Sequence, residues 1–205
     1  MPAEHATAAE TDATLARLIA QGDRLALGRL YARDSAAVYR YGLAMCGNPA
    51  WAADAMQEAF MQFIQQSKGY AGERGSLGAY LCGIARHVLL AQLREPRAPE
   101  PLDEDGDALA PAGTDPAAGP LELLVTRQST EALLAAVRRL PMPFREALIL
   151  VDLQEYDYAQ AAQISGAPLN TLRTRLFRAR KQLAQLLAQP GAASSSEPRS
   201  DHVQA

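Results

Sequence analysis

One stretch of the chain, residues 158–187, concentrates side chains that can bind a nucleic acid. It holds five cations, and no Asp or Glu lies between Tyr158 and Glu197. Arg and Lys bind phosphates, while Arg, Asn, Thr and aromatic groups also contact base edges. The candidate side chains are Asn170, Thr171, Arg173, Thr174, Arg175, Phe177, Arg178, Arg180 and Lys181. A cationic face can also be ordinary solvated surface, so the elements that carry it must be considered next.

Two helices joined by a tight turn are expected to present these side chains. Pro168 suits a first helical position, and Gly166 suits the turn before it. An apolar stripe at helical spacing faces a core, and it consists of Leu172, Leu176, Ala179, Leu183 and Leu186. The preceding helix, residues 157–165, starts with Asp157 as an N-cap candidate. The pair has the length and the glycine turn of a helix-turn-helix, whose second helix enters the major groove.

Phe177 falls on the polar side of the second helix. A base step or a thymine methyl would bury it in a DNA complex. A contact with a neighbouring helix of the same domain would bury it equally well. The sequence leaves both interpretations open.

Composition bounds the class of protein. The 205 residues, 48% of them hydrophobic, suffice for two small helical domains. No apolar run approaches the roughly 20 residues that cross a bilayer, and the N-terminus lacks a signal-peptide pattern, so we expect a cytoplasmic protein without membrane insertion. Cys46 and Cys82 are expected to be buried thiols. The chain shows no metal-ligand spacing, phosphate loop or nucleophile elbow, so we expect no metal, no cofactor and no catalytic residue.

The net charge of −3 conceals an uneven distribution. Residues 1–95 hold nine acids and nine bases, residues 96–120 six acids and one base, and residues 121–190 nine bases and six acids. A nucleic acid responds to local charge, and the basic charge is densest on the helix described above. These changes in local charge, together with the Pro and Gly content of the acidic segment, predict that the chain is divided into five parts. They are a flexible N-terminus (1–11), a helical domain (12–95), an acidic linker (96–120), a second helical domain (121–188) and a disordered tail (189–205).

The N-terminal domain is predicted to be helical throughout. Asp12 can cap a first helix, Gly22-Asp23 interrupts it, and residues 39–45 form a further helix that ends at Gly47. In the next helix, residues 50–66, one side carries Met56, Phe60, Phe63 and Ile64, the first three of which are expected inside. The remaining surface carries Asp54, Gln57, Glu58 and Met61. No alternating strand pattern of useful length occurs, so the expected fold class is all-α.

A turn-rich segment, residues 67–76, precedes the last helix of this domain. It holds Lys68, Tyr70 and Arg74 among turn-forming residues. In the helix of residues 77–93, the apolar stripe is Leu77, Leu81, Ile84 and Val88, and the opposite side carries Arg86, His87, Leu90 and Arg94. An amphipathic helix with some exposed bases is ordinary, so these residues need a second clue.

The order and spacing of several motifs supply that clue. Residues 15–23 (LARLIAQGD), 30–31 (LY), 54–60 (DAMQEAF) and 80–87 (YLCGIARH) resemble sigma domain two of the extracytoplasmic-function (ECF) sigma factors. Residues 140–141 (LP), 145–148 (REAL) and 170–180 (NTLRTRLFRAR) resemble sigma domain four of the same family. Each motif alone is moderately specific, but together they are highly specific. The resemblance covers residues 15–187 outside the linker.

The resemblance implies a subunit that joins bacterial RNA polymerase core enzyme and directs it to promoter DNA. By analogy, Asp54, Gln57, Glu58 and Met61 bind core polymerase. Lys68, Tyr70, Arg74, Tyr80, Arg86, His87 and Arg94 recognise and open the minus-ten element, where aromatic and cationic groups suit single-stranded DNA. The second helix of the C-terminal pair reads the minus-thirty-five element, with Arg173, Thr174, Phe177 and Arg178 at the DNA-reading positions. An anti-sigma factor is the expected partner that covers the polymerase-binding surfaces.

Some positions depart from the family pattern. Tyr80 stands where Trp is usual, His87 where Asn is common, Ala91 where Asp is common, and Gln160 where Glu is frequent. The first three lie in the expected melting region, so they leave the minus-ten preference undetermined.

Two other classes of protein remain open from the sequence. One is a stand-alone helix-turn-helix regulator, which would bind a palindrome as a dimer. The other is a helical adaptor that docks an acidic partner without touching DNA.

Overall fold

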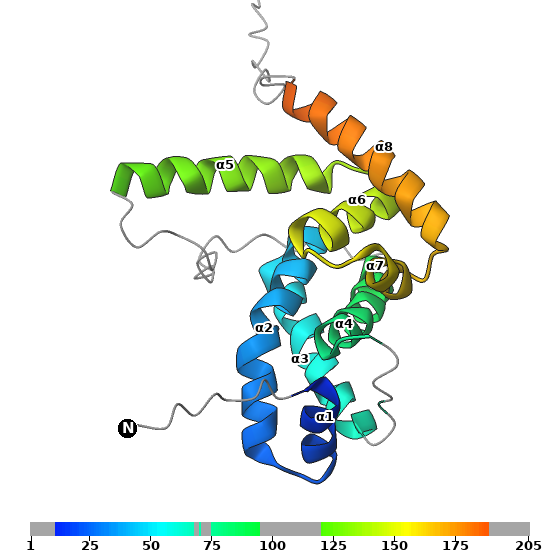
Figure 1. The fold of residues 1–205 in the computed structure, drawn as a ribbon. Helices are drawn as coiled ribbons and strands as arrows, with labels where there is room; N and C mark the ends of the chain where they lie inside the picture. The colour runs from blue at the N-terminus through cyan, green and yellow to red at the C-terminus, as the bar shows by residue number, and fades with distance from the viewer. Residues whose placement is uncertain (1–10, 68–69, 71–74, 95–119, 189–205) are drawn as a thin grey trace, which may run out of the picture.

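The computed structural model describes residues 11–67, 70, 75–94 and 120–188, with side chains from residue 129 onward in the last range. Lys68, Arg74, the predicted linker up to residue 119 and the predicted tail lie outside these residues. Regular structure within the described ranges is helical, which confirms the all-α fold class (Figure 1). The elements are α1 (Asp12–Ala20), α2 (Arg24–Cys46), α3 (Pro49–Gln66), α4 (Leu77–Arg94), α5 (Pro120–Arg138), α6 (Met142–Leu148), the π-helical turn η3 (Ile149–Leu153), α7 (Tyr158–Ser165) and α8 (Leu169–Ala188).

Helices α1–α4 form an N-terminal bundle, in which α2, α3 and α4 pack against one another and α1 packs on α2. Side-chain caps fix where its helices begin. Asp23 accepts from the amides of Leu25 (2.8 Å) and Ala26 (3.2 Å) at the start of α2. Asn48 accepts from the amides of Ala50 (2.9 Å) and Trp51 (3.1 Å) at the start of α3. Each bond satisfies an amide that has no partner within its helix.

Residues 24–46 form one continuous helix, so the predicted separate helix at residues 39–45 is wrong. Between Arg24 and Cys46 no proline interrupts the backbone ladder, and the two internal glycines are accommodated. The predicted end is correct, because Gly47 takes the left-handed conformation with φ 73°. Gly42 lies where α2 crosses α3, since an added Cβ would come within 3.1 Å of the Ala52 Cα atom.

The core of the bundle differs from the prediction at a few positions. Ile64 was placed on the same side of its helix as Met56, Phe60 and Phe63, but it is 40% exposed whereas those three are buried. Cys82 is buried as expected, whereas Cys46 is only half-buried. In α4 the fully buried line runs through Leu81, Ala85 and Leu89 rather than through Ile84 and Val88, which are half-buried. The inner side of α4 is therefore rotated relative to the predicted stripe.

Helices α5–α8 and the turn η3 form a C-terminal unit. In it α6 and α7 pack against α8, as expected for a helix-turn-helix. The buried line of α8 contains Leu172, Leu176 and Ala179, as predicted, and Leu183 and Leu186 pack beside it half-buried. Pro168 flanks α8 rather than starting it, because its carbonyl accepts from the Leu172 amide (2.9 Å) one residue before the helix.

The N-terminal bundle and the C-terminal unit are in contact. Helix α7 lies beside α4, and the end of α2 meets α5, α6 and η3 (Figure 1). Buried side chains of both parts belong to one continuous hydrophobic cluster. The structure is therefore a closed arrangement in which two parts separated by residues 95–119 share a core.

Candidate nucleic-acid interface

The cationic face of α8, formed by Arg173, Arg175, Arg178, Arg180 and Lys181, points away from the core. The buried leucines of α8 fix its rotation, so these cations lie on the outer side, Arg175 half-buried and the other four exposed. Phe177 is 71% exposed among them. No helix of the described residues covers this ring, so the predicted alternative of a neighbouring helix is wrong in this conformation. A large exposed ring on a cationic surface is an available contact for a base or a methyl group.

The turn between α7 and α8 is built as the sequence predicted. Asp157 caps α7 by accepting from the Gln160 amide (2.8 Å), and Gly166 ends it with φ 64°. The guanidinium of Arg173 lies 5.6 Å from the centre of the Tyr158 ring, a distance at which a cation and an aromatic ring attract. This contact joins the two helices close to the start of α8.

The first turns of α8 line a shallow depression on the surface. Its lining residues are Phe144, Asn170, Thr171, Thr174, Arg175 and Arg178. The Thr174 hydroxyl donates to the Asn170 carbonyl (2.9 Å), so its methyl and oxygen have a fixed orientation. Five of the nine predicted minus-thirty-five residues thus line one depression at the N-terminal half of α8, the half that contacts base edges in helix-turn-helix proteins.

Arg180 binds Asp152 of η3 with two bonds of 2.6 and 2.9 Å. Hydrogen bonding to Asp152 raises the pKa of Arg180. Both side chains are accessible, at 54% and 29% exposure. Arg180 was predicted to bind phosphate, and in this conformation a carboxylate of the same unit occupies that guanidinium.

On the N-terminal bundle, α3 presents a second candidate surface. Asp54, Gln57, Glu58 and Met61 are exposed on one side of the helix, and Met61 is exposed to 55%. The side-chain amide of Gln62 donates to the Glu58 carboxylate (2.7 Å), which holds this carboxylate on the surface. These positions are available to a partner, and their role in binding core polymerase stays a prediction.

Three aromatic rings gather where α3 meets α4. Tyr70 and Tyr80 have ring centres 5.5 Å apart, and Phe63 lies 6.2 and 6.1 Å from them, all in edge-on geometry. The Tyr70 hydroxyl donates to the Gly75 carbonyl (2.7 Å), and the Tyr80 hydroxyl to Gln66 (3.4 Å). Edge-on aromatic pairs add stabilising free energy beyond that of the area they bury. The cluster therefore fixes the rings of both predicted minus-ten tyrosines.

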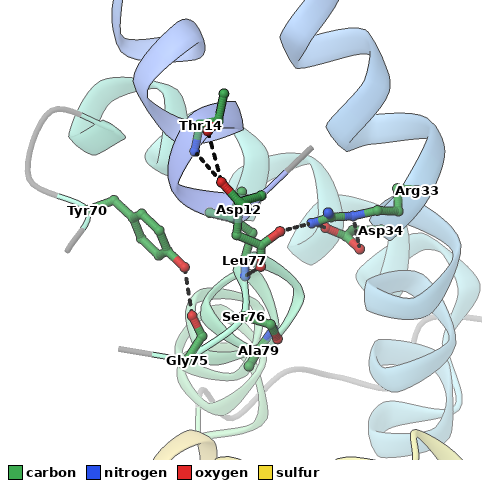
Figure 2. A network of polar contacts seen from close by, with 10 residues as sticks. Asp12, Thr14, Arg33, Asp34, Tyr70, Gly75, Ser76, Leu77 and Ala79 are labelled. Atoms are coloured by element: carbon green, nitrogen blue, oxygen red, sulfur yellow. Dashed lines mark hydrogen bonds and ion pairs between the residues drawn. The ribbon is translucent and has the colours of Figure 1, made fainter. Parts of the chain in front are cut away.

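Asp12 connects the beginning of the chain to the beginning of α4 (Figure 2). Thr11 is the N-cap of α1, so the predicted capping by Asp12 is wrong. The Asp12 carboxylate instead accepts from the Leu77 amide (2.7 Å) and binds Arg33 (2.8 Å), which also binds Asp34 (2.9 Å). No sequence pattern predicts this bond, because its partners are 65 residues apart and one of them is a backbone amide.

The predicted minus-ten residues on α4 have different surroundings. His87 and Arg94 are exposed, as predicted. Arg86 was predicted to project outward, and that is wrong: its side chain is 17% exposed and binds Glu146 of α6. Burial opposes the charged form of Arg86, but the hydrogen bond to Glu146 and the negative charge of this carboxylate together raise the pKa of Arg86. The fully buried Tyr41 also donates to Glu146 (3.3 Å).

Further polar contacts join the two parts of the molecule. Arg145 donates to the carbonyl of Met45 (2.6 Å) at the end of α2, and also to the carbonyls of Arg138 and Leu140. The Cys82 sulfur lies 3.3 Å from the Tyr156 hydroxyl, and burial raises the pKa of the Cys82 thiol to about 11. Sequence reasoning singled out neither the Arg145–Met45 bond nor the Cys82–Tyr156 contact, since each joins segments on opposite sides of residues 95–119.

No described helix has both the length and the apolar character needed to cross a bilayer. No group of three His, Cys, Asp or Glu side chains that could hold a metal ion occurs in the described ranges.

The fold and the surface of α8 define a helical protein of two units, one of which carries a helix-turn-helix. Comparison with known proteins gives the family. Residues 30–98 match the family described as Sigma-70 region 2, and residues 130–183 match Sigma-70, region 4. The chain is 31% identical over 189 residues to the probable RNA polymerase sigma-C factor of Mycobacterium bovis, covering 87% of this chain and 93% of that protein. The chain therefore belongs to the ECF sigma factors of the sigma-70 family.

Two further likenesses are instructive. The ECF RNA polymerase sigma factor BldN of Streptomyces coelicolor is 30% identical over 166 residues, which cover 81% of this chain but only 62% of BldN. The chain thus spans less than two thirds of the length of that relative. The sigma factor RpoE of Bartonella quintana, solved in complex with the anti-sigma factor NepR, matches with a TM-score of 0.58 at 21% identity, covering 80% of this chain and 98% of that one. At this identity the match supports the fold alone.

Proposed function

We propose that this protein binds bacterial RNA polymerase core enzyme in the cytoplasm and directs it to a specific set of promoters. The observation that carries the proposal is the cationic face of α8, which contains no acid and exposes Phe177. Family membership supports a role of this face in recognising the minus-thirty-five element. Arg173, Thr174, Phe177 and Arg178 read bases, and Arg175, Arg180 and Lys181 bind phosphates.

The N-terminal bundle supplies the remaining contacts in this proposal. The aromatic cluster of Phe63, Tyr70 and Tyr80, with His87 and Arg94, binds the minus-ten strand once it is unpaired. Base stacking on such rings contributes on the order of 1–3 kcal/mol per base. The exposed side of α3 binds core polymerase. An anti-sigma factor is the proposed regulatory partner, since a structural relative was solved with one.

Promoter-specific transcription with purified core enzyme tests the proposal. Adding the chain should produce defined transcripts from a genomic promoter library, whereas core enzyme alone should not. If the chain binds DNA as a dimer on palindromic sites and core enzyme gains no specificity, it is a stand-alone regulator. If it binds neither DNA nor core enzyme, it is an adaptor of another kind.

A charge reversal tests the contact with core polymerase separately. Glu58→Lys on α3 should weaken binding to core enzyme, because Glu58 is exposed on the proposed docking side. Glu131→Lys is the matched control, since Glu131 is also an exposed glutamate on a helix, in the C-terminal unit. Circular dichroism should be unchanged in both. Equal core affinities for the two variants would move the docking site away from α3.

A further inference from the structure

We propose that Glu146 acts as an internal ligand of Arg86 that holds the free protein closed, and that DNA must displace this carboxylate to use the minus-ten surface. The inference rests on the proposed function, because it concerns the regulation of the same site. It assigns to Glu146, in the C-terminal unit, a role in controlling a DNA contact of the N-terminal bundle.

The pair is built as a specific bond between the two parts. The Arg86 Nε and Nη2 atoms donate to the two carboxylate oxygens of Glu146, the second bond measuring 3.3 Å. Glu146 is 5% and Arg86 17% exposed, and the Tyr41 hydroxyl donates to the same carboxylate from the fully buried side. A carboxylate that accepts two guanidinium bonds offers the same chemistry as a DNA phosphate. Glu146 and a promoter strand are therefore alternative partners for Arg86.

Neighbouring contacts place the C-terminal unit over the minus-ten surface. Gln163 and Ile164 of α7 line one side of a cavity of about 440 Å³, and Tyr80 and His87 of α4 line another. The Tyr156 hydroxyl reaches Cys82 of α4, at 3.3 Å. In the closed arrangement α7 thus borders the surface on which an unpaired strand would lie.

Promoter geometry requires this arrangement to open. The minus-ten and minus-thirty-five elements are roughly 25 base pairs apart, which corresponds to about 85 Å along the helix axis at 3.4 Å per base pair. In the closed structure α4 contacts α7, which is joined to α8 by a short turn. One chain in this conformation cannot occupy both elements. The 25 residues from 95 to 119 reach about 80–90 Å when fully extended, so the chain connection permits the separation.

The energetics explain how opening can be regulated. A buried ion pair is costly to break when one partner is left behind in the interior. Here both partners lie at the contact between the two parts, so separation returns both to water instead. A ligand that binds only the open form has its affinity reduced by the fraction of open molecules. If fewer than one molecule in ten is open, loss of the internal ligand raises the affinity about tenfold or more.

Two carboxylate variants of the full chain form the central experiment. Glu146→Gln removes the charge and keeps the side-chain size. Asp152→Asn is the matched control, because it removes the other arginine-bound carboxylate, whose partner Arg180 lies in the same unit. Small-angle X-ray scattering measures opening, and anisotropy of a labelled single strand about 12 nucleotides long measures strand binding. Glu146→Gln should shift the pair-distance distribution to longer distances and bind the strand about tenfold more tightly. Asp152→Asn should leave the pair-distance distribution unchanged and, because it frees only Arg180, should change the strand affinity much less.

A second variant covers the possibility that Glu146→Gln disturbs folding. Tyr156→Phe removes only the hydroxyl that reaches Cys82, and it should open the molecule to a smaller extent in the same direction. Circular dichroism establishes which variants are folded. Unchanged scattering and strand affinity in the folded variants overturn the proposal.

The transcription assay keeps this inference separate from the proposed function. In one outcome, the wild-type chain supports transcription while Glu146→Gln shows unchanged scattering and unchanged strand affinity. That result would overturn the role of Glu146 as an internal ligand and leave the proposed sigma activity in place. An expanded Glu146→Gln variant without any strand binding or transcription would confirm the closing contact but overturn competition with DNA.

Discussion

Arg180 and Arg86 each bind a carboxylate with two guanidinium nitrogens, but their surroundings are opposite. The Arg180–Asp152 pair lies on the surface of one unit, at 54% and 29% exposure, whereas the Arg86–Glu146 pair lies between two units at 17% and 5%. An exposed pair contributes about 0–1 kcal/mol, while removing one partner of a buried pair costs about 3–5 kcal/mol if the other stays buried. The same chemistry therefore leaves one cation accessible to DNA and withdraws the other.

The two candidate DNA surfaces differ in the same sense. The cationic face of α8 is supported from behind by buried leucines and is covered by no described helix. The surface of α4 is bordered by α7 and has Arg86 occupied. The comparison indicates that the free protein exposes the proposed minus-thirty-five surface, whereas the proposed minus-ten surface is restrained.

Removal of a buried leucine of α8 should have the largest effect on the difference between the exposed surface of α8 and the restrained surface of α4. Leu172 is fully buried, so Leu172→Ala should lower the free energy of unfolding of the C-terminal unit by about 2–5 kcal/mol. Urea denaturation followed by circular dichroism measures the change. Leu183→Ala, at a half-buried position of the same helix, is the control and should cost less. Equal costs would mean that the buried line does not support the cationic face.

Arg178 and Lys181 separate base reading from phosphate binding on the accessible surface. Arg178→Ala should cost about 1–3 kcal/mol of binding free energy at the preferred sequence and change the selected minus-thirty-five sequence. Lys181→Ala should weaken binding to all sequences and leave the preference unchanged. Selection from a promoter library at several salt concentrations measures both. A uniform loss with the same preference in both variants would remove Arg178 from the base-reading set.

A Tyr70→Phe substitution tests the restrained surface of α4, because it removes a hydroxyl and keeps the aromatic ring. Tyr70→Phe loses the 2.7 Å bond to Gly75, worth about 0.5–1.5 kcal/mol, and keeps the ring contacts with Phe63 and Tyr80. Open-complex formation on duplex promoters should slow, and binding to premelted templates should be nearly normal. Tyr80→Phe is the control, since the bond that it removes is longer, 3.4 Å. An equal defect on premelted templates would exclude a role of the Tyr70 hydroxyl in melting.

Asp152→Asn should have the smallest effect on stability, within about 1 kcal/mol, because the pair that it breaks is exposed. It should nevertheless free Arg180 for phosphate and steepen the slope of log K against log salt by up to about 0.9 on minus-thirty-five duplexes. Glu155→Gln removes the same charge nearby and controls for net charge. Equal slopes in the two variants would show that the Asp152 pair does not restrict Arg180.

The sequence predicted local elements better than contacts between distant segments. The α7–α8 pair was placed to within one residue, because Asp157, Gly166 and Pro168 act on the backbone next to them. The exposure of Asp54, Gln57, Glu58 and Met61 followed from helical spacing in the same way. Residues 24–46 were divided in error, since polar residues near Asp34 interrupt the apolar pattern without breaking the helix.

The surroundings of Arg86 could not be predicted from spacing. Periodicity assigns a residue to one side of its own helix, but it does not say which other element covers that side. Glu146 follows Arg86 by 60 residues, and the acidic segment of residues 96–119, rich in Pro and Gly, lies between them in the sequence. The contact therefore depends on how the two units pack, and only the three-dimensional structure contains that information.

The bond from the Leu77 amide to Asp12 has a consequence for how this protein can evolve. Covariation between two positions arises when their side chains compensate for each other, which marks spatial contact. Asp12 contacts a backbone amide, which every residue except proline supplies, so position 77 is under no pressure to change when position 12 changes. Among relatives, Asp12 should therefore be retained without a covarying partner at position 77. Positions 86 and 146, joined by side chains, should instead be exchanged together.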